Sequence, residues 1–428
     1  MRLHHGAPVA LFVLVLLCVH GGREAEAAGG GFVRAQGTRF VINGSPYYAN
    51  GFNAYWLMTM AADPAQRGKV TSALSQAAAR GLSVARTWAF SDGGSNALQS
   101  APGSYNENIF KGLDFVLSEA RKNGIKVILS LVNNYDTFGG KKQYVEWARG
   151  RGQAIGSEDD FFFTNSLVKA FYKNHVKTVL TRVNTVTGVA YKDDPTILAW
   201  ELMNEPRCQS DLSGRTIQSW ITEMAAHVKS IDGNHMLEAG LEGFYGASSS
   251  SSRAASVNPA GRQVGTDFIA NNRVPGIDFA TVHSYPDQWL SSSDDQAQRN
   301  FLGRWLDAHI ADAQGTLRKP LLIAEFGKSQ RDPGFSSAQR DAQFGMVYAK
   351  IYQSARKGGP TVGGLFWQLM ADGMDSYGDG YQVIFAEAPA STTGVITYES
   401  RKLKMLGKAF ARAERAKGDA SGKVTGGN

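Results

Sequence analysis

The sequence predicts an α/β fold, a (β/α)₈ TIM barrel with a short N-terminal β-hairpin and extended loops after its strands. Eight short apolar segments alternate with stretches of helical periodicity along the 428 residues. Several segments are continuous apolar runs, which is typical of parallel strands covered by helices. The later ones end at residues spaced by steps of 38, 41, 42 and 42 positions: Asn204, Glu242, His283, Glu325 and Trp367. Each step is long enough for one strand and one helix, as a barrel requires.

The individual elements follow in chain order. Residues 32–35 and 39–42 flank Gln36-Gly37-Thr38 and predict the hairpin. The barrel strands are expected at 48–53, 83–88, 126–132, 197–203, 236–240, 279–283, 321–324 and 364–367. Helical periodicity is clearest at 109–122, 216–231, 296–313 and 338–356. A doubly wound open sheet would need a phosphate-binding turn after its first strand, and Gly51-Phe52-Asn53-Ala54 does not provide one.

The two ends of the chain differ in composition from its centre. Arg2 is followed by a 13-residue apolar stretch, 7–19, and then by Ala25-Glu26-Ala27. This pattern predicts a signal peptide at 1–27, since a membrane anchor would need about 20 apolar residues. We therefore expect a secreted, extracellular protein with a single domain at 28–410. The polar residues 411–428 are expected to form a disordered tail.

Charge and cysteine content limit the partners. The net charge is +7, and the 45 Lys and Arg residues are dispersed, so we expect no nucleic acid partner and no membrane association. A basic surface fits residence near acidic cell-wall polymers. Removal of 1–27 leaves Cys208 as the single cysteine, which we expect to be buried and inert. Zinc-protease, phosphate-loop and serine-elbow motifs are absent from the sequence, so we expect no metal and no cofactor. The oligomeric state stays open, with a monomer as the expectation.

Two of the predicted strands end in glutamates. The segment 198–206 is an apolar strand that leads into Asn204-Glu205-Pro206, and the segment 321–327 leads into Glu325. A carboxyl group at the mouth of a barrel is partly desolvated, so its pKa can be adjusted by its surroundings. One such glutamate could equally form a structural ion pair. Two on facing strands favour an acid paired with a nucleophile or a base, as glycoside cleavage requires.

Aromatic and polar side chains accompany these glutamates at other strand ends. Arg86 and Trp88 lie two positions apart in a strand and share a face, as do His283 and Tyr285. Trp367 is the last residue of the last predicted strand. Indole rings stack on the C–H faces of sugars, and the polar groups bind sugar hydroxyls. These positions therefore predict a sugar-binding cleft.

The motifs also carry a family resemblance. The chain is similar to the two signatures of glycoside hydrolase family 5, and within that family to the plant endo-β-1,4-mannanases. The segments that resemble it are Leu131-Val132-Asn133-Asn134, Phe138-Gly139-Gly140, Asn204-Glu205-Pro206-Arg207-Cys208, Glu242-Gly243-Phe244-Tyr245-Gly246, His283-Ser284-Tyr285-Pro286 and Ala324-Glu325-Phe326-Gly327. The resemblance implies a retaining endo-hydrolase of β-1,4-mannan, galactomannan and glucomannan that works by double displacement.

The resemblance also implies residue roles. Glu205 is expected to be the acid/base, or proton donor, with a raised pKa, and Glu325 the nucleophile. Tyr285 would bond the nucleophile, and Arg86 would steady it with His283 nearby. The remaining substrate-binding positions are Asn204 at the sugar 2-hydroxyl, Trp88 and Trp367 along the cleft, Asn133 and Glu242.

Two positions bear on the alternatives. Many cellulase relatives carry a histidine where this chain has Asn133, which favours the mannanase group over a β-1,4-glucanase of the same family. The mannanases are expected to carry tryptophan where this chain has Tyr135, so a contact in the cleft is altered. The second alternative is a carbohydrate-binding protein without turnover, and the presence of both glutamates weighs against it.

Overall fold

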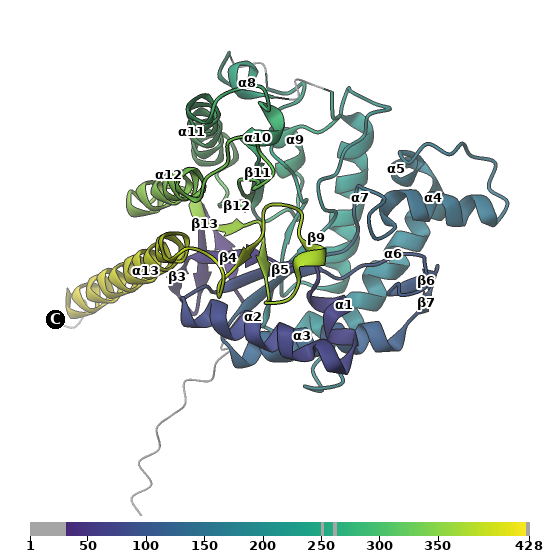
Figure 1. Cartoon of the computed structure of the whole chain (residues 1–428), viewed down its shortest axis with the longest axis horizontal. Helices are drawn as coiled ribbons and strands as arrows, with labels where there is room; N and C mark the ends of the chain where they lie inside the picture. Colours follow the sequence, from purple (N-terminus) through teal and green to yellow (C-terminus); the bar gives the residue numbers. More distant parts are fainter. Residues whose placement is uncertain (1–30, 250–251, 260–262, 425–428) are drawn as a thin grey trace, which may run out of the picture.

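Eight parallel strands form the centre of the molecule, and helices surround them (Figure 1). The computed structural model describes residues 31–249, 252–259 and 263–424. The barrel strands are β4 (Ala49–Asn53), β5 (Val84–Trp88), β8 (Lys126–Ser130), β9 (Ile197–Glu201), β10 (Met236–Glu238), β11 (Ala280–Ser284), β12 (Leu321–Phe326) and β13 (Thr361–Phe366). Each predicted strand overlaps one of them, so the barrel prediction is confirmed.

The sheet is closed by a seam between its first and last strands. The strands are hydrogen-bonded in the order β10-β9-β8-β5-β4-β13-β12-β11. Across the seam the backbone N–H of Asp278 donates to the carbonyl of Leu237 at 2.8 Å, and that of His283 donates to the carbonyl of Glu242 at 2.9 Å. The Leu237 N–H donates to Asp278 Oδ2 at 2.7 Å. Hydrogen bonds at both ends of the seam therefore complete the barrel.

The predicted hairpin is part of a three-stranded antiparallel sheet, β1 (Arg34–Gln36), β2 (Arg39–Ile42) and β3 (Ser45–Tyr47). Asn43 and Gly44 both have positive φ, 49° and 73°, as a two-residue turn between β2 and β3 needs. Phe40 of β2 packs edge-on against Phe279, with ring centroids 5.0 Å apart. The sheet thus contributes to the apolar core at the N-terminal ends of the strands.

The predicted helices are present with small shifts at their ends: α3 (Glu107–Lys122), α7 (Arg215–Ile231), α11 (Asp295–Asp312) and α12 (Ser337–Arg356). The start of α12 is fixed by a capping box between Ser336 and Gln339. The other helices are α1 (Leu57–Ala62), α2 (Arg67–Ala79), α4 (Gly140–Gly150), α5 (Phe161–Thr164), α6 (Ser166–Thr181), α8 (Ser252–Val257), α9 (Phe268–Asn272), α10 (Pro286–Trp289) and α13 (Ala390–Val424). Short helical turns are η1 (Pro64–Gln66), η2 (Tyr191–Asp193), η3 (Ala313–Leu317) and η4 (Asp375–Tyr377). Four further strand pieces lie in loops and form two pairs: β6 (Gln99–Ala101) with β7 (Ser104–Tyr105), and β14 (Leu369–Met370) with β15 (Val383–Ile384).

The last helix corrects the prediction for the C-terminus. Helix α13 continues past residue 411 to Val424, where we expected a disordered tail (Figure 1). Residues 411–417 are Ala, Arg, Glu and Lys only, which are strong helix formers. A polar composition is compatible with a solvated helix as well as with a disordered tail, so composition alone does not distinguish the two.

Two further predictions concern single features. The signal peptide predicted at 1–27 lies outside the described residues. Cys208 is a buried free thiol, as expected. In the described part of the chain, no helix has the length and apolar character needed to cross a membrane.

Candidate active site

A cleft of about 640 Å³ opens at the C-terminal ends of the barrel strands. All the predicted site residues except Arg86 and His283 line it, and those two lie buried directly beneath. The lining consists of Tyr55, Trp88, Asn133, Tyr135, Thr137, Phe138, Asn204, Glu205, Arg207, Glu242, Tyr285, Gln288, Trp289, Glu325, Trp367, Asp379 and Tyr381. The structure therefore brings the residues predicted from the sequence together around one cleft.

Arg86 lies on β5 and is fully buried. Its Nε and Nη2 donate to the two carboxylate oxygens of Glu201 at 2.6 and 2.7 Å. Its Nη1 donates to Glu325 Oε1 at 2.5 Å, and its Nη2 donates to Asn204 Oδ1 at 2.7 Å. Burial disfavours the charged guanidinium, but the charges of Glu201 and Glu325 outweigh it and raise the pKa of Arg86. Arg86 is thus a fixed cation behind the cleft.

Glu325 is the penultimate residue of β12 and is 4% exposed. Besides Arg86, the hydroxyl of Tyr285 donates to its Oε2 at 2.6 Å. His283 Nδ1 lies 3.5 Å from the same oxygen. Burial raises the pKa of Glu325, and the charge of Glu205 adds to this, against the opposing effect of His283 and Arg86. The carboxylate is held in one orientation by two donors.

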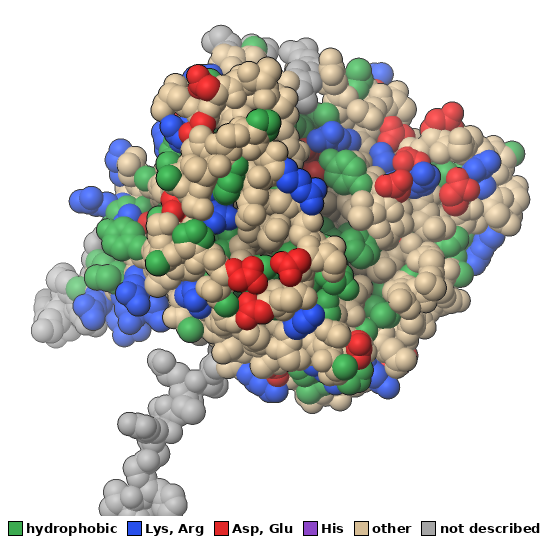
Figure 2. Space-filling view, viewed as in Figure 1, with side chains coloured by type: hydrophobic (Ala, Val, Ile, Leu, Met, Phe, Trp, Pro, Cys, Tyr) green, Lys and Arg blue, Asp and Glu red, His purple; other side chains and the backbone are tan. Residues whose placement is uncertain are grey.

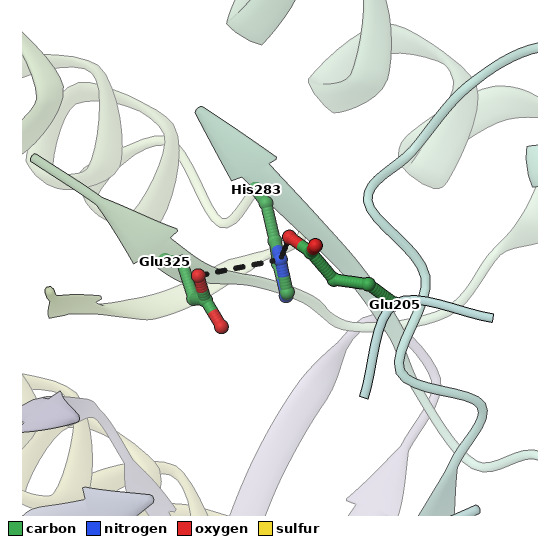
Figure 3. A group of neighbouring side chains, drawn as sticks. All are labelled: Glu205, His283 and Glu325. Atoms are coloured by element: carbon green, nitrogen blue, oxygen red, sulfur yellow. Dashed lines mark hydrogen bonds and ion pairs between the residues drawn. The ribbon is translucent and has the colours of Figure 1, made fainter. Parts of the chain in front are cut away.

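Glu205 faces Glu325 across His283 (Figure 3). It follows β9 with a φ of 50°, a left-handed conformation that non-glycine residues seldom adopt. Its Oε1 lies 2.6 Å from His283 Nδ1, and its Oε2 accepts a hydrogen bond from the Tyr135 hydroxyl at 2.9 Å. The ligand atoms of Glu205, His283 and Glu325 all lie within 4.8 Å of one another. The carboxylates of Glu205 and Glu325 therefore lie close together, with His283 next to both.

The protonation of this group differs from the sequence prediction. Burial raises the pKa of Glu205, but the hydrogen bond and charge of His283, with Arg207 and Tyr135, outweigh it and lower that pKa. For His283, burial favours the neutral ring, yet the neighbouring Glu325 and Glu205 raise its pKa. The expected raised pKa of Glu205 is therefore wrong for the free site, because His283 contacts Glu205 directly.

A metal ion is another occupant to consider for this group of ligand atoms. Both carboxylates already accept hydrogen bonds, Glu205 from Tyr135 and Glu325 from Arg86 and Tyr285. A dication would also lie close to the buried charge of Arg86, which is unfavourable at low dielectric constant. The donors around the two carboxylates therefore favour proton chemistry.

Asn204 and Asn133 form a pair of amides on the cleft wall. The Asn204 Nδ2 donates to Asn133 Oδ1 at 3.0 Å, and the Asn133 Nδ2 donates to the carbonyl of Thr137 at 3.1 Å. With Arg86 on Asn204 Oδ1, the orientation of the Asn204 amide is fixed. Both predicted positions are in the site, supported by groups from β5 and from the loop after β8.

Aromatic rings form the opposite side of the cleft. Trp367 follows β13 and stacks with Tyr55 at 6.1 Å and 15°, while Trp88 lies 6.1 Å away at 39°. The Trp367 Nε1–H donates to Asp379 Oδ2 at 2.6 Å. This wall provides flat apolar surface next to the two glutamates.

Sequence reasoning missed two ion pairs. Arg207 donates to both oxygens of Glu242, at 2.8 and 2.5 Å, so the predicted binding residue Glu242 lies in the cleft with both oxygens occupied. Burial and the charge of Glu205 raise the pKa of Glu242 to about 8, against the effect of Arg207. The other missed residue is Glu201, the main partner of Arg86. Arg207 directly follows Asn204-Glu205-Pro206, which was the available signal; Glu201 had none beyond its place in a strand.

Comparison with known families agrees with this geometry. A family model described as "GH family 5 beta-mannosidase-like" matches residues 30–374. The chain belongs to this group of glycoside hydrolase family 5. The matched residues include the barrel strands and all ten predicted site residues.

Curated relatives match over nearly the full length. Mannan endo-1,4-beta-mannosidase 1 of Oryza sativa subsp. japonica is 76% identical over 416 residues, which cover 96% of this chain and 96% of the relative. Mannan endo-1,4-beta-mannosidase 7 of Arabidopsis thaliana is 62% identical, with 95% and 93% covered. Among solved structures, the endo-1,4-beta-mannanase from Rhizomucor miehei is 30% identical with a TM-score of 0.73, covering 88% of this chain and 100% of that chain. The family and the barrel fold are thus supported by sequence and by structure.

Proposed function

We propose that this family 5 member is a secreted, retaining endo-β-1,4-mannanase that cleaves internal bonds of mannan, galactomannan and glucomannan. The observation that carries the proposal is the meeting of Glu205 and Glu325 around His283, in a chain 76% identical to a mannan endo-1,4-beta-mannosidase. One carboxylate oxygen of each lies within 4.8 Å of an oxygen of the other. Retaining glycosidases hold their carboxyl groups about 5–5.5 Å apart and inverting ones about 6.5–9.5 Å apart, so the separation favours retention.

In the first step Glu325 acts as the nucleophile. Its carboxylate forms a bond to the anomeric carbon while the bond from that carbon to the glycosidic oxygen breaks. The departing oxygen takes a proton from Glu205. Arg86 and Tyr285 hold Glu325 at 2.5 and 2.6 Å, so the nucleophile needs little reorganisation to attack.

The proton for this step is stored in the Glu205–His283 pair. His283 Nδ1 lies 2.6 Å from Glu205 Oε1, and against the effect of burial the charges of Glu325 and Glu205 raise the pKa of His283, which favours a proton shared within this pair. A bound sugar chain excludes water from the cleft, which strengthens the desolvation that raises the pKa of Glu205. The proton then passes from His283 to Glu205 and on to the leaving oxygen.

In the second step water completes the cycle. Glu205, now ionised, removes a proton from water, whose oxygen bonds to the anomeric carbon as the bond to Glu325 breaks. Glu325 regains its negative charge, and the proton that Glu205 took from water returns to His283, which restores the starting state. Because each step inverts the anomeric carbon, the product keeps the β configuration.

The remaining predicted residues would bind the sugar chain. Asn204 is positioned to bond the 2-hydroxyl of the sugar being cleaved, and its amide is fixed by Asn133 and Arg86. Trp367 would stack beneath that sugar, with Trp88 beside it. Since mannose and glucose differ at carbon 2, contacts at this hydroxyl would separate a mannanase from a glucanase.

The test combines a substrate panel with two variants. Galactomannan should be cleaved far faster than carboxymethylcellulose, and the first product seen by NMR should be the β anomer. The Glu325→Ala variant should lose turnover, and azide with an activated aryl β-mannobioside should restore it and give the α-mannosyl azide. Glu205→Ala should give the β-azide instead, because azide there replaces water in the second step. The exposed glutamate variant Glu146→Ala serves as the control and should behave as the parent.

Three results would overturn the proposal. An α-anomeric first product would mean inversion, and preference for carboxymethylcellulose would mean a glucanase. Binding of galactomannan without release of reducing ends would mean a carbohydrate-binding protein. Release to the medium as a monomer that begins after Ala27 is part of the same proposal. N-terminal sequencing and sedimentation of the secreted protein test it.

A further inference from the structure

The net charge of the chain is concentrated in one helix. Residues 401–424 contain eight Lys and Arg against two acidic residues, a net charge of +6 (8 − 2). The whole chain has +7 (45 − 38), so the remainder has only +1 (37 − 36). The individual cations are dispersed along the chain, but the excess of positive charge is not. It belongs to the C-terminal part of α13.

Five of these cations form one exposed row, the α13 basic stripe. Its members, Arg401, Lys404, Lys408, Arg412 and Arg415, follow one another at spacings of three, four, four and three residues. Such spacing places side chains on the same face of a helix. With a rise of about 1.5 Å per residue, the stripe is about 21 Å long. Lys and Arg side chains gather over α13 on the visible face of the molecule (Figure 2).

The stripe is not neutralised by its surroundings. All five side chains are exposed, and in the described part of the chain none of them has an ion-pair partner. Glu399, the acidic residue of α13 whose side chain the structure describes, is buried and pairs with Lys402 instead. Closely spaced cations repel one another, so the stripe favours a partner of opposite charge.

A groove lies beside the stripe. Lys404 and Lys408 line a hollow of about 510 Å³, together with Tyr48, Asn123 and other residues of β3, α13 and the starts of the barrel strands. This is the N-terminal end of the barrel, opposite the catalytic cleft. A polymer held here would leave the cleft free.

The packing of α13 argues against a lipid membrane as the partner of the stripe. A helix that lies in a membrane interface needs a free apolar face. The apolar face of α13 is used already, because Ile396 and Leu403 are buried where the helix packs against α12 and β3. Tyr398 and Met405 are the large apolar side chains of α13 that stay exposed, at 65% and 70%.

We propose that the α13 basic stripe and its groove bind an acidic polysaccharide, a linear polyuronate whose carboxylates follow the row of cations. The choice of a polysaccharide rests on the proposed function, because a secreted hydrolase of wall mannan meets uronate polymers rather than nucleic acid. Binding at this face would hold the enzyme next to its neutral substrate through charge, without using the catalytic cleft.

The experiment compares two matched variants of the full chain. The stripe variant carries Arg401→Gln, Lys404→Gln, Lys408→Gln and Arg412→Gln; glutamine keeps helix propensity and removes charge. The control variant carries Lys111→Gln, Arg121→Gln, Lys177→Gln and Arg304→Gln, exposed helical cations elsewhere. Affinity for polygalacturonate is measured by affinity electrophoresis at 50 and 200 mM salt. Fully methyl-esterified polygalacturonate, anionic phospholipid vesicles and duplex DNA are the comparison probes.

We expect the parent and the control variant to bind polygalacturonate, with affinity falling as salt rises. The stripe variant should bind at least about tenfold more weakly, since each cation near an anionic surface contributes attraction. Equal loss in both variants, or tighter binding to vesicles or DNA than to polygalacturonate, would overturn the proposal. Hydrolysis of soluble galactomannan should be the same in all three proteins. That assay reports on the proposed function and the binding assay on the stripe, so the two can fail separately.

Discussion

At the scale of single residues, Tyr135 is the contact that sets this chain apart from the pattern expected of its relatives. Its hydroxyl donates to Glu205 Oε2, while His283 occupies Oε1. A tryptophan at this position has no hydroxyl and could not make the same bond. The bond favours the ionised carboxylate, so Tyr135 contributes to the lowered pKa of Glu205.

Tyr135→Phe should therefore raise the pKa of Glu205. The acid/base group would keep its proton to higher pH, so the alkaline limb of the kcat/KM profile should move upward, and the acid limb should stay in place. We expect the value at the optimum to fall by no more than about tenfold, because Glu205 keeps its contact with His283. A pH–rate profile on galactomannan measures this. Tyr398→Phe, an exposed tyrosine on α13, is the control, and a downward shift in Tyr135→Phe would contradict the assignment.

At the scale of elements, the loop between β13 and α13 positions the aromatic wall. Asp379 accepts hydrogen bonds from Trp367 Nε1 at 2.6 Å and from Gln368 Nε2 at 3.0 Å. Its other oxygen accepts from the backbone N–H of Tyr381 at 2.9 Å. One aspartate thus connects the loop to the indole that is proposed to lie under the sugar.

Asp379→Ala should loosen Trp367 without removing its ring. We expect kcat/KM on galactomannan to fall about tenfold, since a small displacement of a positioning group costs one to two orders of magnitude. The melting temperature should change little. Asp375→Ala, in the exposed η4 turn of the same loop, is the matched control. Equal activity in the two variants would show that Asp379 does not orient the ring.

At the scale of the whole molecule, closure of the barrel depends on the seam between β10 and β11. Asp278 contributes its backbone N–H to Leu237 and accepts from the Leu237 N–H through its side chain. Lys229 of α7 donates to the same carboxylate at 2.7 Å. The seam is therefore joined to an outer helix by one aspartate.

Asp278→Ala should lower the free energy of unfolding by about 1–3 kcal/mol, because it leaves the buried N–H of Leu237 without an acceptor. The midpoint of urea unfolding measures the loss. Asp307→Ala removes the exposed pair with Lys350 and should cost about 0.5 kcal/mol or less. If both variants unfold at the same urea concentration, the Asp278 side chain does not stabilise the seam as proposed.

The sequence predicted the barrel strands and the two glutamates, but it did not predict the ion pairs around them. Buried parallel strands are apolar throughout, so the sequence predicted them. Glu205 and Glu325 could be predicted as site residues because each lies at the C-terminal end of such an apolar segment. Glu201 did not, because its partner Arg86 is 115 positions away and their pairing depends on how the strands neighbour one another. The pair of Arg207 and Glu242 and the length of α13 were also missed. The ion pair depends on how two loops pack, whereas the extension of α13 was missed because its polar residues are also strong helix formers.

The single thiol of the described chain has a practical consequence. Cys208 is buried and free, so the barrel within the described residues is held by noncovalent forces alone. The fold then requires neither an oxidising compartment nor a disulfide-exchange catalyst. Expression in a reducing bacterial cytoplasm should give the same barrel as passage through a secretory route, and reductants can be present throughout purification without harm.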